Sequence, residues 1–183
     1  MHRFWRKSGE GFEGAHYRAG GTTDSAMPHQ KPHPPVWVGG KGDALLRVAA
    51  AHADAWNAPV LSPDQVAERA ERLRALCEAE GRPMIEVTYE GPVWIHDDAD
   101  AVERRLARNR ASGNPVARRY ADVAIAGTPD VVAARLEEYG RAGVTHVVCH
   151  FGKTTDLSGT QLFAREVMPR FQKTESRTDT AGR

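Results

Sequence analysis

The chain is predicted to be an α/β protein with parallel strands, because short apolar strands alternate with amphipathic helices along most of its length. Strand patterns are centred on residues 36–38, 55–57, 85–95 and 145–151, and a helix pattern separates each from the next. A connection that contains a helix is long enough to join parallel strands. Residues 36–38 and 147–149 are apolar on both faces, as covered strands are. This pattern fits both a (β/α)8 barrel and an open doubly wound sheet.

A glycine-rich turn follows the first strand, Val36–Val38, and leads into a helix predicted over residues 44–53. The turn consists of Gly39, Gly40, Lys41 and Gly42. Glycine lets a backbone approach an anion closely, and the first N–H groups of a helix have no partner within it. The turn is therefore a candidate phosphate site. The alternative is that the glycines only form a tight strand-to-helix turn.

The second unit begins with a very short strand that ends at Asn57. Ser62, Pro63 and Gln65 have the residue types of a capping box with proline in the first turn, so a helix is predicted to begin there. The apolar stripe of this helix, and the residues that end it, are Val66, Ala70, Leu73 and Cys77, then Gly81 and Pro83.

The third strand covers residues 85–95, which are rich in β-branched and aromatic side chains. Gly91–Pro92 would either interrupt this strand or lie within it. Thr128–Pro129 is predicted to begin the next helix, which ends at residues 140–143. Its inward-facing side chains are Val132, Leu136 and Tyr139.

The last strand is predicted over residues 145–151 and a closing helix over residues 161–171. Pro169 would end or kink this helix, since proline removes a helical N–H donor. His146 and His150 alternate with apolar residues along the strand and so share one face.

Five short motifs follow one another at spacings typical of one family. They are Phe12–Tyr17, Pro32–Gly40, Ala53–Asn57, Gly127–Pro129 and Ala142–Val148. In this order, over roughly residues 4 to 171, the chain resembles the bacterial luciferase-like monooxygenases. The resemblance implies a (β/α)8 TIM barrel whose fifth to eighth strands are the ones found here. It also implies FMN or a deazaflavin (coenzyme F-420) as cofactor, a cofactor phosphate near Gly39–Gly42, Asn57 near the cofactor, and a small-molecule substrate.

The length of 183 residues is short for a whole barrel of this type, which takes roughly 250 residues and at least about 200. Residues 2–7 also have the pattern of an amphipathic helix, with no capping residue before them. We therefore expect the carboxyl-terminal half of a barrel, truncated at an internal methionine. Residues 1–172 would form the partial barrel, with a helix end and an insertion loop in residues 1–33, and residues 173–183 a disordered polar tail. Such a fragment would be inactive alone and would self-associate or pair with the missing amino-terminal half.

Composition argues against nucleic-acid and membrane partners. The chain has 25 basic and 24 acidic residues, so its net charge of +1 creates no general field for an anionic polymer. The arginine-rich run at residues 103–110 lacks interleaved aromatic side chains and is predicted to be the solvated face of a helix. No apolar stretch reaches the roughly 18 residues that span a bilayer. The protein is predicted to be cytoplasmic, with Cys77 and Cys149 as reduced thiols.

Two further residues are candidates for a site at the carboxyl ends of the strands, where barrel enzymes place their functional groups. Asn57 could contact a flavin ring, a phosphate or a substrate, or cap the following loop. His150 is a candidate substrate residue, or else a hydrogen-bonded histidine beneath the closing helix. His29 and His33 have no third ligand nearby, so no metal site is predicted.

No nucleophile with an adjacent base stands out, so the catalytic residues stay unassigned. A flavin supplies its own redox chemistry, and a protein that binds one needs chiefly to orient it and exclude water. The leading interpretation is a fragment of a luciferase-like oxidoreductase that uses reduced flavin with oxygen, or a deazaflavin hydride donor. The alternative is a non-catalytic α/β half-barrel module that self-associates or binds a phosphorylated ligand.

Overall fold

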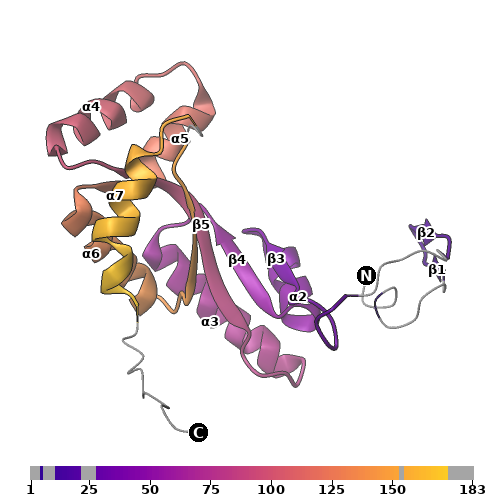
Figure 1. Ribbon diagram of the computed structural model, residues 1–183. Helices are drawn as coiled ribbons and strands as arrows, with labels where there is room; N and C mark the ends of the chain where they lie inside the picture. The colour runs from indigo at the N-terminus through magenta and orange to yellow at the C-terminus, as the bar shows by residue number, and fades with distance from the viewer. Residues whose placement is uncertain (1–4, 6–10, 22–27, 153–154, 173–183) are drawn as a thin grey trace, which may run out of the picture.

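The computed structural model describes residue 5 and residues 11–21, 28–152 and 155–172, and its central feature is a parallel five-stranded sheet (Figure 1). Strand β5 pairs with β4, with β7 and, at its carboxyl end, with β6, while β3 pairs with β4. The four main strands therefore lie side by side in the order β3-β4-β5-β7. The strand bounds are β3 (Trp37–Gly39), β4 (Ala55–Pro59), β5 (Glu86–Ile95), β6 (Ile125–Gly127) and β7 (His146–His150).

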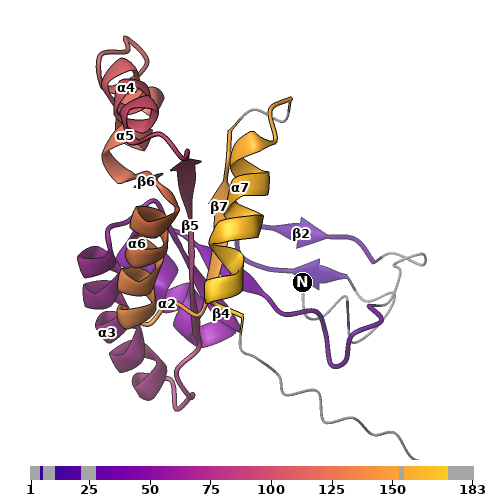
Figure 2. The ribbon, with the colours of Figure 1, turned by 60° about the vertical axis from the view of Figure 1, so that its left-hand side comes forward.

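Four helices pack on one side of this sheet (Figure 2). They are α2 (Asp43–His52), α3 (Pro63–Ala79), α6 (Pro129–Arg141) and α7 (Ser158–Glu166). The core lies between these helices and the sheet, and its largest fully buried side chains are Trp56, Tyr89, Tyr139, Leu46 and Leu73. Helices on one face only are the arrangement of a barrel wall, in which the other face lines the interior.

The uncovered face of the sheet is curved like the inside of a barrel. Trp37 on β3 and His146 on β7 come from opposite edges of the main four strands, yet their rings meet edge to face with centroids 5.1 Å apart. Flat neighbouring strands are about 4.8 Å apart, so three strand spacings would separate β3 from β7 in a flat sheet. Contact between the two rings therefore requires a concave sheet. We call this surface the concave face.

Helix α3 begins and packs as its sequence predicts. The Ser62 hydroxyl accepts a hydrogen bond from Gln65 N at 3.3 Å, and the Gln65 side chain accepts one from Ser62 N at 3.0 Å. The predicted stripe is buried in full: Val66, Ala70, Leu73 and Cys77. The reciprocal cap satisfies two backbone donors that the first turn leaves without helical partners.

Strand β5 runs without interruption through Gly91–Pro92. Pairing with β4 ends at Glu90, while pairing with β7 continues to Pro92. Beside Pro92, β5 therefore has a strand neighbour on one side only. A residue without an N–H donor is tolerated where one side of a strand is unpaired.

The sequence did not predict β6 or the helix α5 (Pro115–Val123), which follows α4 (Ala99–Arg110). Three residues are too few for strand alternation to be read, and β6 is held only by the last three residues of β5. Helices α4 and α5 form a second small core with Trp94 of β5. This pair lies beyond the carboxyl end of β5 (Figure 1).

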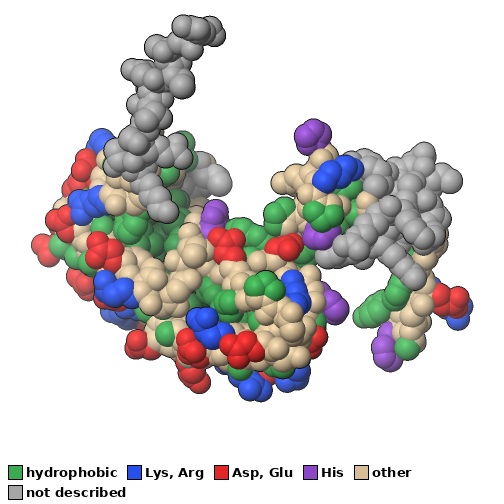
Figure 3. Space-filling view, turned by 90° about the horizontal axis from the view of Figure 1, so that it is seen from below, with side chains coloured by type: hydrophobic (Ala, Val, Ile, Leu, Met, Phe, Trp, Pro, Cys, Tyr) green, Lys and Arg blue, Asp and Glu red, His purple; other side chains and the backbone are tan. Residues whose placement is uncertain are grey.

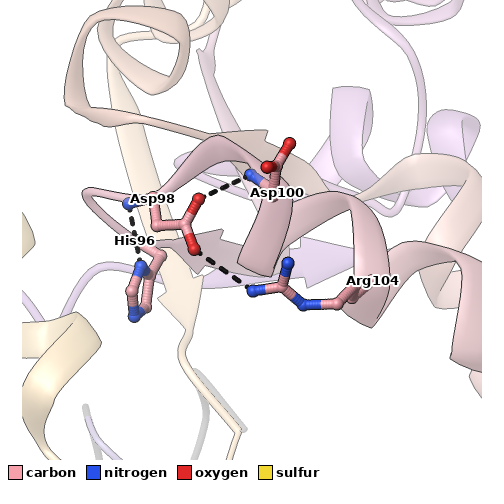
Figure 4. Close-up of polar contacts among 4 residues, drawn as sticks. All are labelled: His96, Asp98, Asp100 and Arg104. Atoms are coloured by element: carbon pink, nitrogen blue, oxygen red, sulfur yellow. Dashed lines mark hydrogen bonds and ion pairs between the residues drawn. The ribbon is translucent and has the colours of Figure 1, made fainter.

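Helix α4 begins at a well-defined cap (Figure 4). Asp98 Oδ1 accepts a hydrogen bond from Asp100 N at 2.9 Å, and Oδ2 accepts one from Arg104 at 3.1 Å. These partners, the Asp100 N–H first, lower the pKa of the Asp98 carboxyl. His96 Nδ1 accepts the Asp98 N–H at 2.9 Å, so the loop leaving β5 is held close to the helix start.

The two ends of the chain differ from the prediction in part. A short antiparallel hairpin, β1 (Phe12–Glu13) and β2 (Arg18–Ala19), lies in the predicted insertion loop and stands away from the sheet (Figure 1). Helix α7 ends earlier than predicted, and a 3-10 turn at Met168–Arg170 contains Pro169. The predicted tail at 173–183, and all but Trp5 of the predicted helix at 2–7, lie outside the described residues.

The two cysteines form no disulfide bond with each other. Cys77 is buried, Cys149 is partly buried, and both are free. Burial raises the pKa of Cys149 to about 11, so its thiol stays protonated at neutral pH.

Across residues 28–152 and the other described segments, no helix is long and apolar enough to cross a membrane.

Gly91 makes room for a buried tyrosine, which leads to a stability prediction. A Cβ at Gly91 would lie 2.1 Å from the Tyr89 hydroxyl oxygen, and that hydroxyl has no hydrogen-bond partner among the described residues. Gly91→Ala is expected to destabilise by about 1–3 kcal/mol through overpacking. Tyr89→Phe should be nearly neutral, since it removes only an unpaired hydroxyl. In the double variant, urea unfolding should recover part of the Gly91→Ala loss; strictly additive free energies would contradict the contact.

Candidate cofactor and substrate site

The glycine turn after β3 is built by the packing around it. Gly40 has a φ of +149°, and a Cβ there would lie 2.1 Å from Leu45 Cδ1. Its carbonyl accepts a hydrogen bond from Trp56 Nε1 at 2.9 Å, and its N–H donates to Asn57 O at 3.2 Å. Gly40 is thus required by the turn itself, whatever the turn binds.

Gly42 is the position of the turn at which a side chain would enter open space, and it is called the open position below. It is the N-cap of α2 with a φ of −83°, and a Cβ there would meet nothing within 4 Å. No side chain caps α2, and the Leu45 N–H already donates to Gly42 O at 3.0 Å, so the N–H groups of Asp43 and Ala44 are the ones left for water or a ligand. The carboxylate of Asp43 lies in this first turn, 3.6 Å from Arg69.

Positive charge gathers beside the turn. Lys41 Nζ donates a hydrogen bond to Val60 O at 3.0 Å, which links the turn after β3 to the loop after β4. Partial burial, followed by the positive charges of Arg119 and Arg69, lowers the pKa of Lys41. Arg69 and Arg119, from two other elements, therefore lie close enough to influence Lys41. Such a cluster favours an anion.

The loop after β4 carries backbone strain next to this cluster. Val60 has a φ of +54°, a left-handed conformation that is costly for a β-branched residue. Its N–H donates to Glu90 O at 2.8 Å and its carbonyl accepts from Lys41, so both sides of the residue are held. Strain of this kind is found most often at functional sites.

Asn57 occupies the centre of the site. Its backbone is in register with Gly39, and a Cβ at Gly39 would lie 3.7 Å from Asn57 Nδ2, so both positions face the concave side. The Asn57 side chain donates to Glu90 Oε2 at 2.6 Å and accepts from the Thr88 hydroxyl at 3.0 Å. Asn57 therefore connects the glycine turn with β5 instead of capping its own loop.

His150 also faces the concave side. Its Nε2 lies 3.2 Å from Glu90 Oε1, and the alternating residues Val147 and Cys149 pack toward the helices. His150 has a polar partner, as the alternative expected, but it lies on the concave face and not beneath the closing helix. The structure brings Asn57 and His150 together through Glu90, which the sequence did not single out.

Thr88 and Glu90 were the site residues that sequence reasoning missed. Thr88 is fully buried, as is rare for a polar residue in a strand of apolar pattern. The available signal was the spacing of Glu86, Thr88 and Glu90, which places three polar side chains on one face of an otherwise apolar strand. Among the described residues, no group of three or more His, Cys, Asp or Glu side chains is arranged to hold a metal ion.

The family model for luciferase-like monooxygenases matches residues 1–124, more than half of the chain. The chain belongs to the luciferase-like monooxygenase family. Its membership confirms the family resemblance seen in the sequence, and solved structures of similar fold agree with it.

Three solved structures illustrate this similarity. The monooxygenase RslO1 of Streptomyces bottropensis is 19% identical, with a TM-score of 0.73 over 93% of this chain and 58% of its own. The coenzyme F-420-dependent tetrahydromethanopterin reductase of Methanopyrus kandleri is 20% identical, with a TM-score of 0.73 over 93% of this chain and 60% of its own. A riboflavin lyase solved with modified FMN is 15% identical, with a TM-score of 0.67 over 89% of this chain and 48% of its own.

The luciferase-like chain spans 48 to 60% of the length of these three structures. Nearly all of this chain is matched by about half of each larger protein. Together with the parallel sheet β3-β4-β5-β7 and its concave face, this coverage confirms the predicted α/β fold and agrees with a partial (β/α)8 barrel.

Proposed function

We propose that the chain forms the carboxyl-terminal half of a flavin- or deazaflavin-dependent oxidoreductase that acts on a small molecule. Family membership supports the class of enzyme. The observation that carries the site assignment is the junction of β3 and α2, where an uncapped helix start, an open Gly42 and three cationic side chains occur together.

The cofactor phosphate would be held by the turn Gly39–Gly42. Gly42 leaves space above the first-turn N–H groups of α2, and glycine backbones there permit close approach. Lys41 and its cationic neighbours offset the phosphate charge and the charge of Asp43. These features fit FMN and coenzyme F-420 equally, because both carry a phosphate. Asn57 would contact the cofactor from the next strand.

The bound flavin or deazaflavin would supply the redox chemistry, as reduced flavin with oxygen or as a hydride donor. The residues of this chain bind, orient and exclude water. His150 would contact the substrate, since it faces the concave side with 42% of its side chain exposed. The half-barrel is expected to be inactive alone and to need further strands, from the amino-terminal half or from a second copy.

The domain assignment accompanies this proposal. Residues 1–172 would act as one partial barrel domain in the cytoplasm, with residues 173–183 as a polar tail. The two uncovered edges, at β3 and β7, support pairing with other strands, because within the described residues neither edge has a partner on its outer side. Unpaired strand edges favour association.

Gly42→Asp tests the phosphate site. The open space and ordinary φ allow aspartate there, and aspartate is a good N-cap, so stability should hold or rise slightly. The new negative charge should lower affinity for FMN and coenzyme F-420 on the order of 100-fold, about 2.8 kcal/mol. Fluorescence titration would measure this for the chain alone and with an amino-terminal half of a luciferase-like relative supplied in trans.

Gly113→Asp is the matched control. It makes the same charge change at an exposed glycine whose Cβ would also meet nothing within 4 Å, between α4 and α5. Its affinity should equal that of the parent. Equal affinities for parent and Gly42→Asp would place the phosphate elsewhere. Tight binding of simple phosphate esters without preference for a flavin would favour the non-catalytic module.

A further inference from the structure

A chain of polar contacts crosses three strands on the concave face. Glu90 is a carboxylate and can only accept from Asn57, so the amide NH2 of Asn57 must face Glu90 and its oxygen must face Thr88. The Thr88 hydroxyl then donates to that oxygen. Because Thr88 is fully buried, the chain is anchored at this end.

The other end of the chain is open to solvent. Glu90 Oε1 lies 3.2 Å from His150 Nε2, and the side chains are 35% and 42% exposed, respectively. A carboxylate beside Nε2 favours the proton on that nitrogen. In that tautomer the lone pair lies on Nδ1, which has no hydrogen-bond or ion-pair partner among the described residues.

This arrangement adds little to the stability of the sheet. Strands β5 and β7 are already joined over five residue pairs, from Thr88–His146 to Pro92–His150. Partly exposed ion pairs contribute little by themselves. The chain of contacts instead resembles the general arrangement in which a fixed carboxylate sets the tautomer and direction of a histidine base.

We propose that His150 is a catalytic proton acceptor for a hydroxyl-bearing small molecule and that Glu90 is its positioning residue. This inference rests on the proposed function, whose substrate contact it makes specific. The substrate O–H bond breaks, its electron pair stays on oxygen, and the proton forms a new bond to Nδ1. The Glu90 carboxylate balances the charge of the resulting imidazolium, and the reverse transfer protonates an alkoxide. Asn57 and Thr88 hold Glu90 in place.

The tautomer of His150 provides a test that needs no bound cofactor. Long-range 1H–15N NMR of the 15N-labelled chain at pH 8 should show His150 as the Nε2–H form. In Glu90→Gln, the carbonyl can accept from Asn57 only if its NH2 faces His150, so the Nδ1–H form should become the major one. The ring signals of His150 and His146 are assigned as those that disappear in His150→Gln and His146→Gln, respectively.

Two controls separate this effect from a general disturbance. Glu86 lies on the same face of β5 but bonds to the Thr145 hydroxyl, so Glu86→Gln should leave the His150 tautomer unchanged. His146, which packs on Trp37, should keep its signals in every variant except its own substitution if the sheet stays folded. A parent His150 in the Nδ1–H form, or no change in Glu90→Gln, would overturn the proposal.

A kinetic readout applies once the barrel is completed. Glu90→Gln should lower kcat about tenfold with little change in KM, because the group acts through His150 and not on binding. An unchanged kcat would also overturn the proposal. Failure of the proposed function would be seen separately, as absence of flavin and deazaflavin binding in the titration of the parent, while the tautomer result would stand.

Discussion

Trp56→Ala should lower the free energy of unfolding by about 3–5 kcal/mol, as substitutions of fully buried aromatic residues do. The Trp56 side chain is completely buried between the sheet and the helices, and its ring N–H donates to Gly40 O at 2.9 Å. The substitution leaves a large cavity and releases the glycine turn. The loss is a large part of the roughly 5–15 kcal/mol that stabilises a typical domain. Chemical denaturation followed by circular dichroism would measure it.

Trp37→Ala is a control of the same residue type on the neighbouring strand. Trp37 faces the concave side and is 41% exposed, so its removal should cost much less than removal of Trp56. Trp56→Phe removes the N–H donor but only part of the ring, so its loss should lie between those of Trp37→Ala and Trp56→Ala. Similar unfolding curves for Trp56→Ala and Trp37→Ala would contradict the packing described here.

The second large effect concerns association. The isolated chain is expected to form dimers or larger assemblies at micromolar concentration, because strand edges and apolar side chains at β3 and β7 are left without strand partners in the described residues. A hollow of about 500 Å³ between α6 and α7 adds apolar surface near the β7 edge. Its lining includes Val147, Phe163, Met168 and Phe171. Seen from below, hydrophobic side chains (green) gather in a hollow of this surface (Figure 3).

Trp37→Lys tests whether the β3 edge and concave face take part in that association. The substitution places a charge on an exposed edge residue and should weaken association about tenfold, corresponding to about 1.4 kcal/mol from partial loss of apolar burial. Val116→Lys, on the exposed side of α5 and 56% exposed, is the matched control and should change nothing. Sedimentation velocity would show the difference. A monodisperse monomer with a sharp cooperative melt would contradict the interpretation that unpaired strand edges at β3 and β7 drive association.

Local sequence patterns were sufficient for the elements whose signal is contained in neighbouring residues. The capping box at Ser62 and Gln65 and the buried stripe of α3 are set by helix geometry, which the sequence shows directly. The parallel direction of the strands was predicted from helix-length connections, since a connection of that length is what joins parallel strands. Strand β6 and helix α5 escaped prediction because three residues carry no period and because Pro115 and Asn114 were not recognised as a helix start.

In the site, too, some features could be predicted from neighbouring residues and others could not. Residue types and spacing predicted the glycine turn and, together with the family resemblance, Asn57 and His150 as candidates, because glycine conformation and strand alternation are local properties. Only the tertiary structure showed that Gly40 is required by Leu45 and Trp56, that Gly42 is the open position, and that Glu90 joins Asn57 to His150. These relations depend on strand register and sheet curvature, which bring together side chains as far apart in sequence as Asn57 and His150. No local pattern encodes such distances, because they arise only when separate strands pair.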